Sequence, residues 1–269
     1  MIKFENTEVV GWESAIRGMR NPMNSWEKSD SGYCFEYSPA HCLNCAYVDN
    51  GCNASEADIN TRYIIGNKDL NLMTRLRNAG TDHRKFMRMI TVYVDITAPL
   101  YWWKEFDTYK VGTVANSCST MHKIAEKEFT LNDFSHEHLE GRALNTLEDM
   151  VDELNYWRDY YLAIKKQKVV GADKKSKELW WQMIQLLPIK KQKVVGADKK
   201  SKELWWQMIQ LLPSSYNQRR TVMLNYEVLA NIYKSRKNHK LDEWHMFCDW
   251  ILTLPYGSLL KESVGNEQS

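Results

Sequence analysis

The chain has 269 residues, of which 43% are hydrophobic, and this is enough for a globular core in one large domain. Its formal net charge of +2 excludes a strongly basic surface of the kind that binds nucleic acid. No apolar run approaches the roughly 20 residues of a membrane span, and the first six residues do not begin a signal peptide. We therefore expect a single domain over residues 1–269 that is cytoplasmic and has no membrane partner.

The first predicted elements are a strand and a helix, followed by a long loop. Residues 8–20 read as a strand running into a helix, which Asn21 and Pro22 close. Residues 27–60 are polar and rich in Gly, Ser, Asn and Asp, and this composition indicates an extended loop insertion.

Four of the chain's six cysteines fall in or near this loop, next to a histidine. They are Cys34, Cys42, Cys45 and Cys52, with His41 adjacent to the second. The two-residue spacing of Cys42 and Cys45 lets two thiolates share one tetrahedral metal. The outer spacings, of seven and six residues, match no zinc ribbon. A structural metal and reduced, unligated cysteines are both open, and we favour the second, so we expect no metal.

The middle of the chain predicts a helix, a strand and a second helix. Residues 69–78 have apolar side chains at helical spacing, whereas residues 90–96 are β-branched, aromatic and alternating, as in a strand. A helix follows over residues 100–106 with Trp102 and Trp103, whose rings could flank a flat ligand. A core position is the favoured alternative for both rings.

Residues 164–188 and 189–213 are the same 25 residues. Repeat architectures need about three or more units, which differ from one another, so we interpret one copy as a surplus insertion. The functional unit then has 244 residues, and each copy reads as a linker and a short helix ending at Leu-Pro. Each copy holds six Lys, one Asp and one Glu, so setting one aside leaves 30 basic and 32 acidic residues. This mixed surface indicates no nucleic-acid partner.

The C-terminal half is dominated by helical patterns. Residues 146–163, 217–236 and 241–254 each predict a helix, and we expect the tail after Tyr256 to be frayed. Strands mixed with several long helices indicate an α+β fold with a mixed sheet rather than a regular βαβ series.

Polar and charged residues follow Leu212 and Pro213 at fixed offsets. They are Arg219, Asn225, Asn231 and Arg236, then His239 and Trp244. The pattern resembles the C-terminal signature of the flavin-dependent thymidylate synthases, in which Leu-Pro is followed by Arg, Asn, Asn and Arg and then by a His and a Trp. The match over Pro213–Arg236 needs no gap.

A second block also resembles this family. Gly80, His83, the predicted strand and the Ala-Pro at 98–99 follow in the family's order. With one extra residue allowed, Asn116 and Ser119 fall on the Asn and the second Ser of the signature that comes next. The chain departs from that signature where the family has Arg-His-Arg, with Thr108, Tyr109 and Lys110.

The resemblance implies reductive methylation of dUMP by a homotetramer whose active sites lie at subunit interfaces. It implies FAD as cofactor, NADPH as reductant and methylenetetrahydrofolate as one-carbon donor. The residues it implies are Arg219, Arg236 and Glu105 for the nucleotide, Asn231, Lys110, Tyr109, Asn116 and His83 for flavin, and Ser119 as the catalytic residue beside the base. The altered signature leaves two alternatives open: a related flavin enzyme acting on another pyrimidine nucleotide, and a non-catalytic oligomeric binding protein.

The two implied arginines raise a geometric question. In one continuous helix over 217–236, Arg219 and Arg236 are 17 residues apart, roughly 25 Å along the axis. They cannot then hold one phosphate from the same chain. We expect either a break in the helix or a site shared between subunits, and two solvated surface arginines are the remaining alternative.

Overall fold

The computed structural model describes residues 2–34, 63–169 and 197–261, and the chain divides into two compact units. Unit 1 combines Ala98–Lys104 with Ser117–Arg219, and unit 2 combines Ile2–Thr97, Glu105–Asn116 and Arg220–Ser269. The single domain expected from the sequence stays a prediction. None of the helices in these described ranges is long and apolar enough to cross a membrane.

A four-stranded sheet has the order β1-β4-β6-β5. The strands are β1 (Lys3–Val10), β4 (Thr91–Pro99), β6 (Asn217–Asn225) and β5 (Thr113–Ser117). β1 pairs antiparallel with β4, and the register shifts between Glu5 and Glu8. Strands distant in the sequence are therefore neighbours in the sheet.

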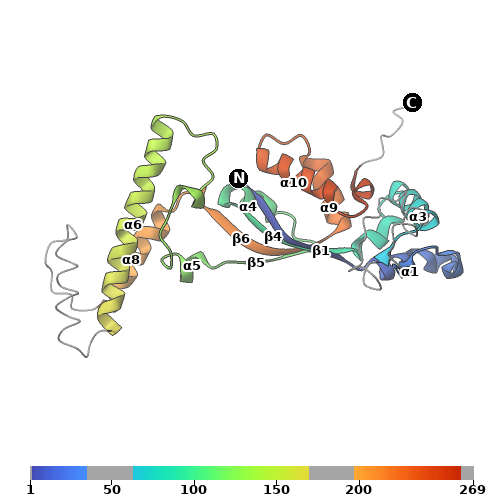
Figure 1. Ribbon diagram of the computed structural model, residues 1–269, viewed down its shortest axis with the longest axis horizontal. Helices are drawn as coiled ribbons and strands as arrows, with labels where there is room; N and C mark the ends of the chain where they lie inside the picture. The colour runs from blue at the N-terminus through green and yellow to red at the C-terminus, as the bar shows by residue number, and fades with distance from the viewer. Residues whose placement is uncertain (1, 35–62, 170–196, 262–269) are drawn as a thin grey trace. The chain divides into compact units, whose positions relative to one another are not determined.

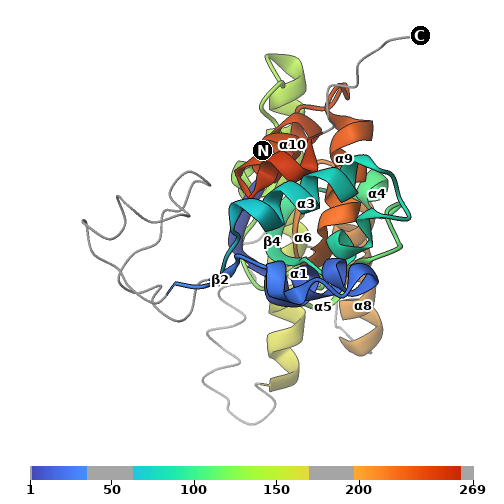
Figure 2. The same ribbon diagram turned by 90° about the vertical axis from the view of Figure 1, so that its right-hand side faces the viewer.

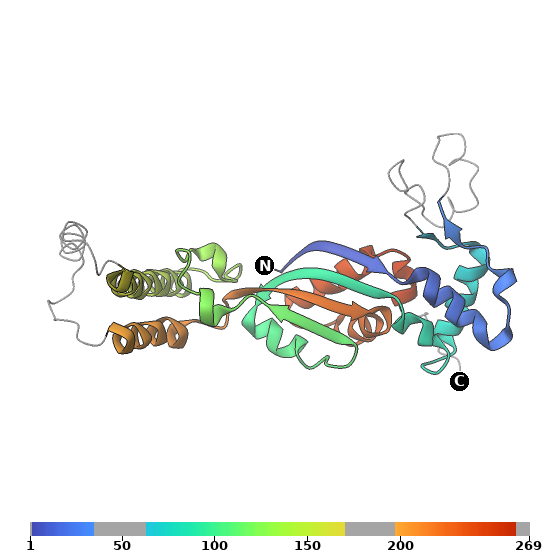
Figure 3. The same ribbon diagram turned by 90° about the horizontal axis from the view of Figure 1, so that it is seen from below.

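The helices α9 (Tyr226–Arg236) and α10 (Asp242–Thr253) cover one face of this sheet (Figures 1 and 3). Alternate residues of β4 are buried on that side, while Tyr93 on the other side is 43% exposed. The residues that fill the layer between sheet and helices are large and apolar, among them Val92, Val94, Ile96, Leu229, Ile232, Trp244 and Phe247. This packing fixes the orientation of α9, whose outer side remains available to other groups.

The end of unit 2 is built from short helices. α1 (Trp12–Arg20) and α3 (Asn67–Asn78) lie near one another there (Figure 2), and η5 (Arg84–Arg88) contacts α1, α3 and α9. Gly11 precedes α1 with φ of +95°, and a Cβ at this position would lie 2.2 Å from the Met89 carbonyl oxygen. Glycine is therefore required where the chain turns from β1 into α1.

Smaller elements complete this end. They are η1 (Asn21–Met23), η2 (Trp26–Lys28), the paired strands β2 (Gly32–Tyr33) and β3 (Tyr63–Ile64), and η7 (Gly257–Leu260). Residues 35–60 of the predicted loop, with His41, Cys42, Cys45 and Cys52, lie outside the described residues. Cys34 is half-buried, and no group of three or more potential metal ligands occurs among the described residues.

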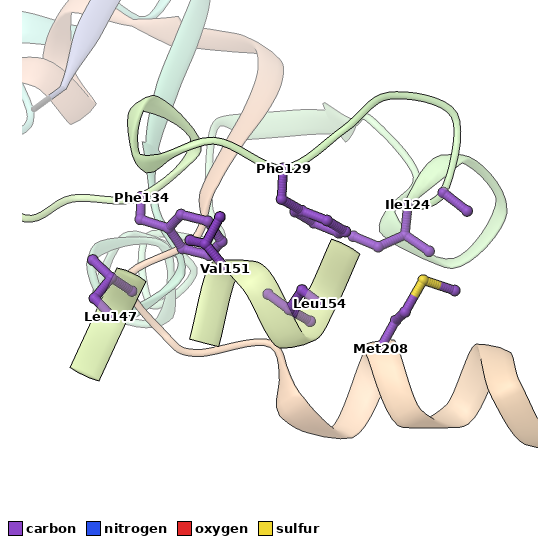
Figure 4. Packing of buried hydrophobic residues seen from close by; sticks show 8 residues of the cluster. Ile124, Phe129, Phe134, Leu147, Val151, Leu154 and Met208 are labelled. Carbon is purple, nitrogen blue, oxygen red and sulfur yellow. The ribbon is translucent and has the colours of Figure 1, made fainter. Parts of the chain in front are cut away.

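Unit 1 contains a pair of long helices, α6 (Arg142–Val169) and α8 (Ala197–Leu211), which lie side by side (Figures 1 and 3). α4 (Leu100–Phe106) has only its last two residues in unit 2, and α5 (Thr120–Lys123) and η6 (Leu131–Asp133) lie in unit 1. A buried apolar cluster joins the long helices to the segment before them (Figure 4). Its residues are Ile124, Ala125, Phe129, Phe134, Leu147, Val151, Leu154 and Met208. α8 belongs to the second of the two identical copies, and most of the first copy lies outside the described residues.

Two sequence predictions about the C-terminal part are wrong. Residues 217–236 are not one helix, because β6 ends at Asn225 and α9 begins at Tyr226. Alternate burial of Gln218, Val222 and Leu224 marks the strand. The separation of roughly 25 Å along one helix therefore does not apply, and a site shared between subunits rests on the resemblance alone. The tail is not frayed directly after Tyr256, because Leu260 in η7 is 1% exposed.

Candidate functional site

One face of α9 carries a row of three polar side chains. Glu227, Asn231 and Ser235 are four residues apart in turn, so they lie one above the other along the helix. The Asn225 side chain fixes the start of α9, because its Oδ1 accepts a hydrogen bond from the Val228 N–H at 3.0 Å. The helix therefore presents a defined line of polar groups within unit 2.

Two arginines of η5 bind Glu227 at the beginning of this row. Arg84 Nε donates to Oε1 at 3.2 Å, while Arg88 donates from Nε to Oε2 and from Nη2 to Oε1, the latter at 3.3 Å. Burial raises the pKa of Glu227, but hydrogen bonds and charges from Arg88 and Arg84 outweigh it and hold the pKa below its usual range. Glu227 is therefore ionised at neutral pH, and this group of three side chains carries a net charge of +1.

Asn231 is the next residue of the row and is oriented by the same arginine. Arg84 Nη2 donates to Asn231 Oδ1 at 3.1 Å, so the amide oxygen faces Arg84. The amide nitrogen Nδ2 has no partner among the described residues. His83, which directly precedes Arg84, is exposed. This part of unit 2 therefore offers an outward-facing amide beside a fixed guanidinium group.

A second ionic group lies at the end of α9 around Glu105. Glu105 Oε2 accepts hydrogen bonds from Arg236 Nη1 at 2.9 Å and from Trp244 Nε1 at 3.0 Å. The same oxygen lies 3.3 Å from His239 Nε2. The Arg236 and Glu105 side chains are 21% and 35% exposed, so this ion pair is accessible from solvent.

Tyr109 connects this ionic group to the polar row of α9. Arg236 Nε donates to the Tyr109 hydroxyl at 2.9 Å, and this hydroxyl lies 3.2 Å from Ser235 Oγ. The Arg236 guanidinium also lies over the Trp244 ring, 4.7 Å from its centroid, which adds a cation–π contact. Ser235 Oγ in turn donates to the Asn231 carbonyl oxygen at 2.7 Å.

We call this continuous set of contacts the α9 strip. It consists of Arg84, Arg88, Glu227, Asn231, Ser235, Tyr109, Arg236 and Glu105, all in unit 2. Four of these residues were indicated by the sequence: Glu105, Tyr109, Asn231 and Arg236. His83 and Lys110 are each adjacent in sequence to a member of the strip, and both are exposed.

The other sequence-indicated residues are not part of the strip. Asn116 is exposed in β5, while Ser119 and Arg219 belong to unit 1. The Cys118 N–H donates to the Arg219 carbonyl oxygen at 2.9 Å. This backbone hydrogen bond places Ser119, the residue after Cys118, near Arg219. Ser119 Oγ accepts from the His122 N–H at 3.2 Å and caps α5. No basic side chain among the described residues hydrogen-bonds this hydroxyl.

Trp102 and Trp103 are core residues, as favoured from the sequence. They are 0% and 1% exposed, and Trp103 Nε1 donates to the Gln218 carbonyl oxygen at 2.9 Å. Rings buried to this extent within unit 1 are committed to packing.

Sequence reasoning missed four members of the strip, Arg84, Arg88, Glu227 and Ser235. The signal that could have indicated Glu227 is its four-residue spacing from Asn231, which is meaningful only once α9 is known to begin at Tyr226. Arg84 and Arg88 are separated from Glu227 by 143 and 139 residues, and no local pattern predicts such contacts.

The residues of the strip suit an anionic ligand with a planar polar ring. Guanidinium groups match phosphate oxygens, and an outward amide matches the carbonyl edge of a ring. Four donors have no hydrogen-bond partner among the described residues and remain available for such a ligand. They are Arg84 Nη1, Arg88 Nη1, Arg236 Nη2 and Asn231 Nδ2. The chemistry of these donors therefore fits a flavin nucleotide.

Comparisons with known proteins agree on the fold. No protein-family model and no curated protein matches this sequence. Two similar solved structures are flavin-dependent thymidylate synthases, named ThyX, from Helicobacter pylori with FAD and dUMP. One has a TM-score of 0.52 at 12% identity and covers 93% of this chain and 91% of its own. The other has a TM-score of 0.56 at 14% identity and covers 97% of each. The expected fold class is confirmed, and the chain has an α+β fold like that of the flavin-dependent thymidylate synthases.

Proposed function

We propose that the protein is a divergent flavin-dependent thymidylate synthase that methylates dUMP reductively, with FAD as cofactor, NADPH as reductant and methylenetetrahydrofolate as one-carbon donor. The observation that carries the proposal is the α9 strip. Arg236, Glu105, Tyr109 and Asn231 were indicated by the sequence resemblance. In a chain with this fold Arg236 contacts Glu105 and Tyr109 directly, and Ser235 links Tyr109 to Asn231. The solved structures with the same fold contain FAD and dUMP, which supports both ligands here.

The ionic group around Glu105 is suited to hold the nucleotide. Glu105 and Tyr109 each accept from a different nitrogen of Arg236, so the guanidinium plane is fixed while Nη2 stays free to donate to a phosphate. Trp244 stacks under the same guanidinium and keeps it from rotating away. In this proposal Arg219 supplies a further charge to the nucleotide from another subunit, as the family resemblance implies.

The other half of the strip is suited to hold the flavin. Asn231 donates from Nδ2 to the ring, and Arg84 holds the amide in that orientation. Lys110, Asn116 and His83 are exposed donors that the proposal also assigns to the cofactor. When bound, the flavin supplies the hydride chemistry, and the protein supplies orientation and charge.

Ser119 and the assembly state complete the proposal. Ser119 Oγ accepts from a backbone N–H and keeps its own proton, with which it can donate to a pyrimidine base. The homotetramer implied by the resemblance is tested by light scattering of the purified protein. A monomer would remove the subunit interfaces at which the proposed active sites lie.

Titration with FAD tests the proposed function most directly. We expect the purified protein to carry, or to take up, FAD with a flavin absorption spectrum, and to bind dUMP more tightly once flavin is present. The control is Lys123→Ala, which removes an exposed cation of unit 1 and should change neither affinity. A colourless protein without a thermal shift in excess FAD would rule out the flavin enzyme.

Two other functions keep specific support. Thr108, Tyr109 and Lys110 replace the family's Arg-His-Arg, which favours a related flavin enzyme acting on another pyrimidine nucleotide. Ser119 caps a helix, and Glu105 and Glu227 neutralise arginines of the strip, which favours a non-catalytic binding protein. Flavin uptake without turnover of dUMP separates the first from the main proposal, and absence of flavin favours the second.

A further inference from the structure

The arrangement around Glu227 differs from an ordinary ion pair because one carboxylate holds two arginines. Arg84 uses Nε and Nη2 for its contacts with Glu227 and Asn231, and Arg88 uses Nε and Nη2 for Glu227. The Nη1 group of each arginine therefore has no partner among the described residues. The two guanidinium groups are held side by side, each with donors left over.

We propose that Glu227 is a positioning residue that holds Arg84 and Arg88 as a paired binding site for a phosphate-class anion. The proposal deepens the proposed function, because the anion would be the phosphate of a ligand on the α9 strip. It does not require this ligand to contain a flavin.

Charge and shape both support an anionic ligand. Two guanidinium groups and one carboxylate leave a net charge of +1, and Asn231 Nδ2 is a third, neutral donor beside them. A guanidinium group presents parallel N–H donors that match the oxygens of a phosphate. A pyrophosphate has enough oxygens for both arginines and the amide.

Positioning matters because arginine side chains are otherwise mobile. Fixing a free arginine costs rotamer entropy, which weakens the binding of any ligand that has to order the side chain itself. Glu227 is 11% exposed and sits in the first turn of α9, so it is itself held by the helix. The contacts to Glu227 therefore meet this entropic cost before the anion arrives.

Substitution of Glu227 by glutamine tests whether Glu227 positions the two arginines or only neutralises part of their charge. Glu227→Gln removes a negative charge, so a site governed by net charge alone would bind anions more tightly. The amide keeps one accepting oxygen, but its NH₂ group cannot accept the hydrogen bond that Arg88 Nε donates to Oε2. We therefore expect inorganic pyrophosphate to bind about 10-fold more weakly, the loss of one hydrogen bond to a charged group. Glu227→Asp keeps the charge with a shorter reach and should recover part of the affinity.

Two further variants test the arginines while keeping their charge. In Arg84→Lys and Arg88→Lys an ammonium group replaces the parallel N–H donors of the guanidinium group. We expect each substitution to weaken pyrophosphate binding about 5-fold or more. Lys123→Ala serves as the matched control and should leave binding unchanged. Thermal unfolding is recorded for every variant, and calorimetry is performed well below each melting temperature, so a loss of folding is not mistaken for a loss of binding.

The source of the phosphate is resolved by three further ligands. FAD, riboflavin and dUMP are titrated into wild type and Glu227→Gln. If Glu227→Gln loses affinity for FAD alone, the site binds the cofactor's pyrophosphate. If it loses affinity for dUMP alone, the site binds the phosphate of the nucleotide. Equal or tighter pyrophosphate binding by Glu227→Gln overturns the positioning role. Pyrophosphate binding with the expected losses, but without FAD uptake, leaves that role intact and overturns the flavin enzyme instead.

Discussion

Arg20 and Asp69 are 5% and 0% exposed, whereas Arg84 and Arg88, which share Glu227, are 23% and 49% exposed. Every nitrogen of the Arg20 guanidinium has a partner: Nε donates to Asp69 Oδ1 at 2.6 Å, and Nη1 and Nη2 donate to the carbonyl oxygens of Ser25 and Lys28 at 3.1 Å each. The two centres in unit 2 thus use the same chemical groups, but only one of them retains free donors.

The partners of Asp69 show what the buried centre does. Its Oδ2 accepts from the hydroxyls of Ser29 and Ser31 at 2.6 Å each, and its backbone N–H donates to Asp30 Oδ1 at 3.0 Å. These contacts join α1, residues 25–31 and the start of α3. A buried pair with complete hydrogen bonding is a structural clasp, whereas a half-exposed pair with spare donors is suited to a ligand.

The largest effect should follow from breaking the buried clasp. Asp69→Asn removes the charge that compensates Arg20, and we expect a loss of about 3–5 kcal/mol in the free energy of unfolding, because a buried charge is left unpaired. The control is Asp107→Asn, which breaks an ion pair with Arg220 in which Asp107 is 52% exposed. Its expected loss is about 1 kcal/mol or less. Urea denaturation measures both, and equal losses would show that burial does not distinguish these pairs.

Replacing Arg236 should have the opposite outcome to replacing Asp69. It should weaken nucleotide binding and change the free energy of unfolding little. We expect Arg236→Ala to weaken dUMP binding by about 1.5–3 kcal/mol, the range for a hydrogen bond to a charged group. Arg236→Lys should recover only part of the affinity, because an ammonium group cannot replace the fork. Calorimetry with dUMP decides this, and unchanged affinity in both variants would make Arg236 an internal partner of Glu105 only.

Acid should weaken the buried clasp through Asp69. Burial raises the pKa of Asp69, but hydrogen bonds from Ser29, Ser31 and Arg20 together with the Arg20 charge outweigh it and lower the pKa. The resulting stability is present above the unfolded value of about 3.9 and is lost as the pH falls toward the folded pKa.

The free energy of unfolding should therefore fall by up to about 1.4 kcal/mol per pH unit below pH 4 from this group alone. Asp69→Asn should remove that part of the slope in denaturation curves recorded between neutral and acidic pH. Parallel slopes in the variant and the wild type would show that Asp69 titrates normally.

The sequence predicts the elements far better than it predicts the contacts between them. The helix at 69–78 and the strand at 90–96 follow from local periodicity, and the structure confirms both. β6 was missed because Arg219, Arg220 and Thr221 interrupt the apolar alternation that otherwise indicates a strand. The alternation of apolar residues along one strand does not show which of its side chains the rest of the protein buries.

The site was only partly predictable for a related reason. Glu105, Tyr109, Asn231 and Arg236 were indicated by resemblance to a family, and none of them by local pattern. Arg84 and Glu227 meet across 143 residues, and charged residues are expected at the surface, so the sequence does not indicate which of them pair. The same holds for Arg20, whose burial follows from partners supplied by two separate segments, residues 25–28 and the start of α3.

The smallest effect on either centre should come from removing one of the identical copies. Deletion of 164–188 or of 189–213 yields the same 244-residue chain, and neither centre contains a residue from these ranges. We therefore expect pyrophosphate and dUMP affinities to stay unchanged. The 27 residues between the end of α6 and the start of α8 would become two. Since each doubling of a loop costs about 0.6 kcal/mol, stability should not decrease.

The duplication also offers its own matched control. Met208 is 0% exposed in the apolar cluster of unit 1, and Met183 is the identical position of the first copy, outside the described residues. Only one copy can occupy the place of α8, so Met208→Ala should cost about 2–5 kcal/mol and Met183→Ala much less. Both are compared by urea denaturation with the shortened chain. Equal costs, or unfolding of the shortened chain, would show that the second copy is an integral part of the protein and that its removal is not neutral.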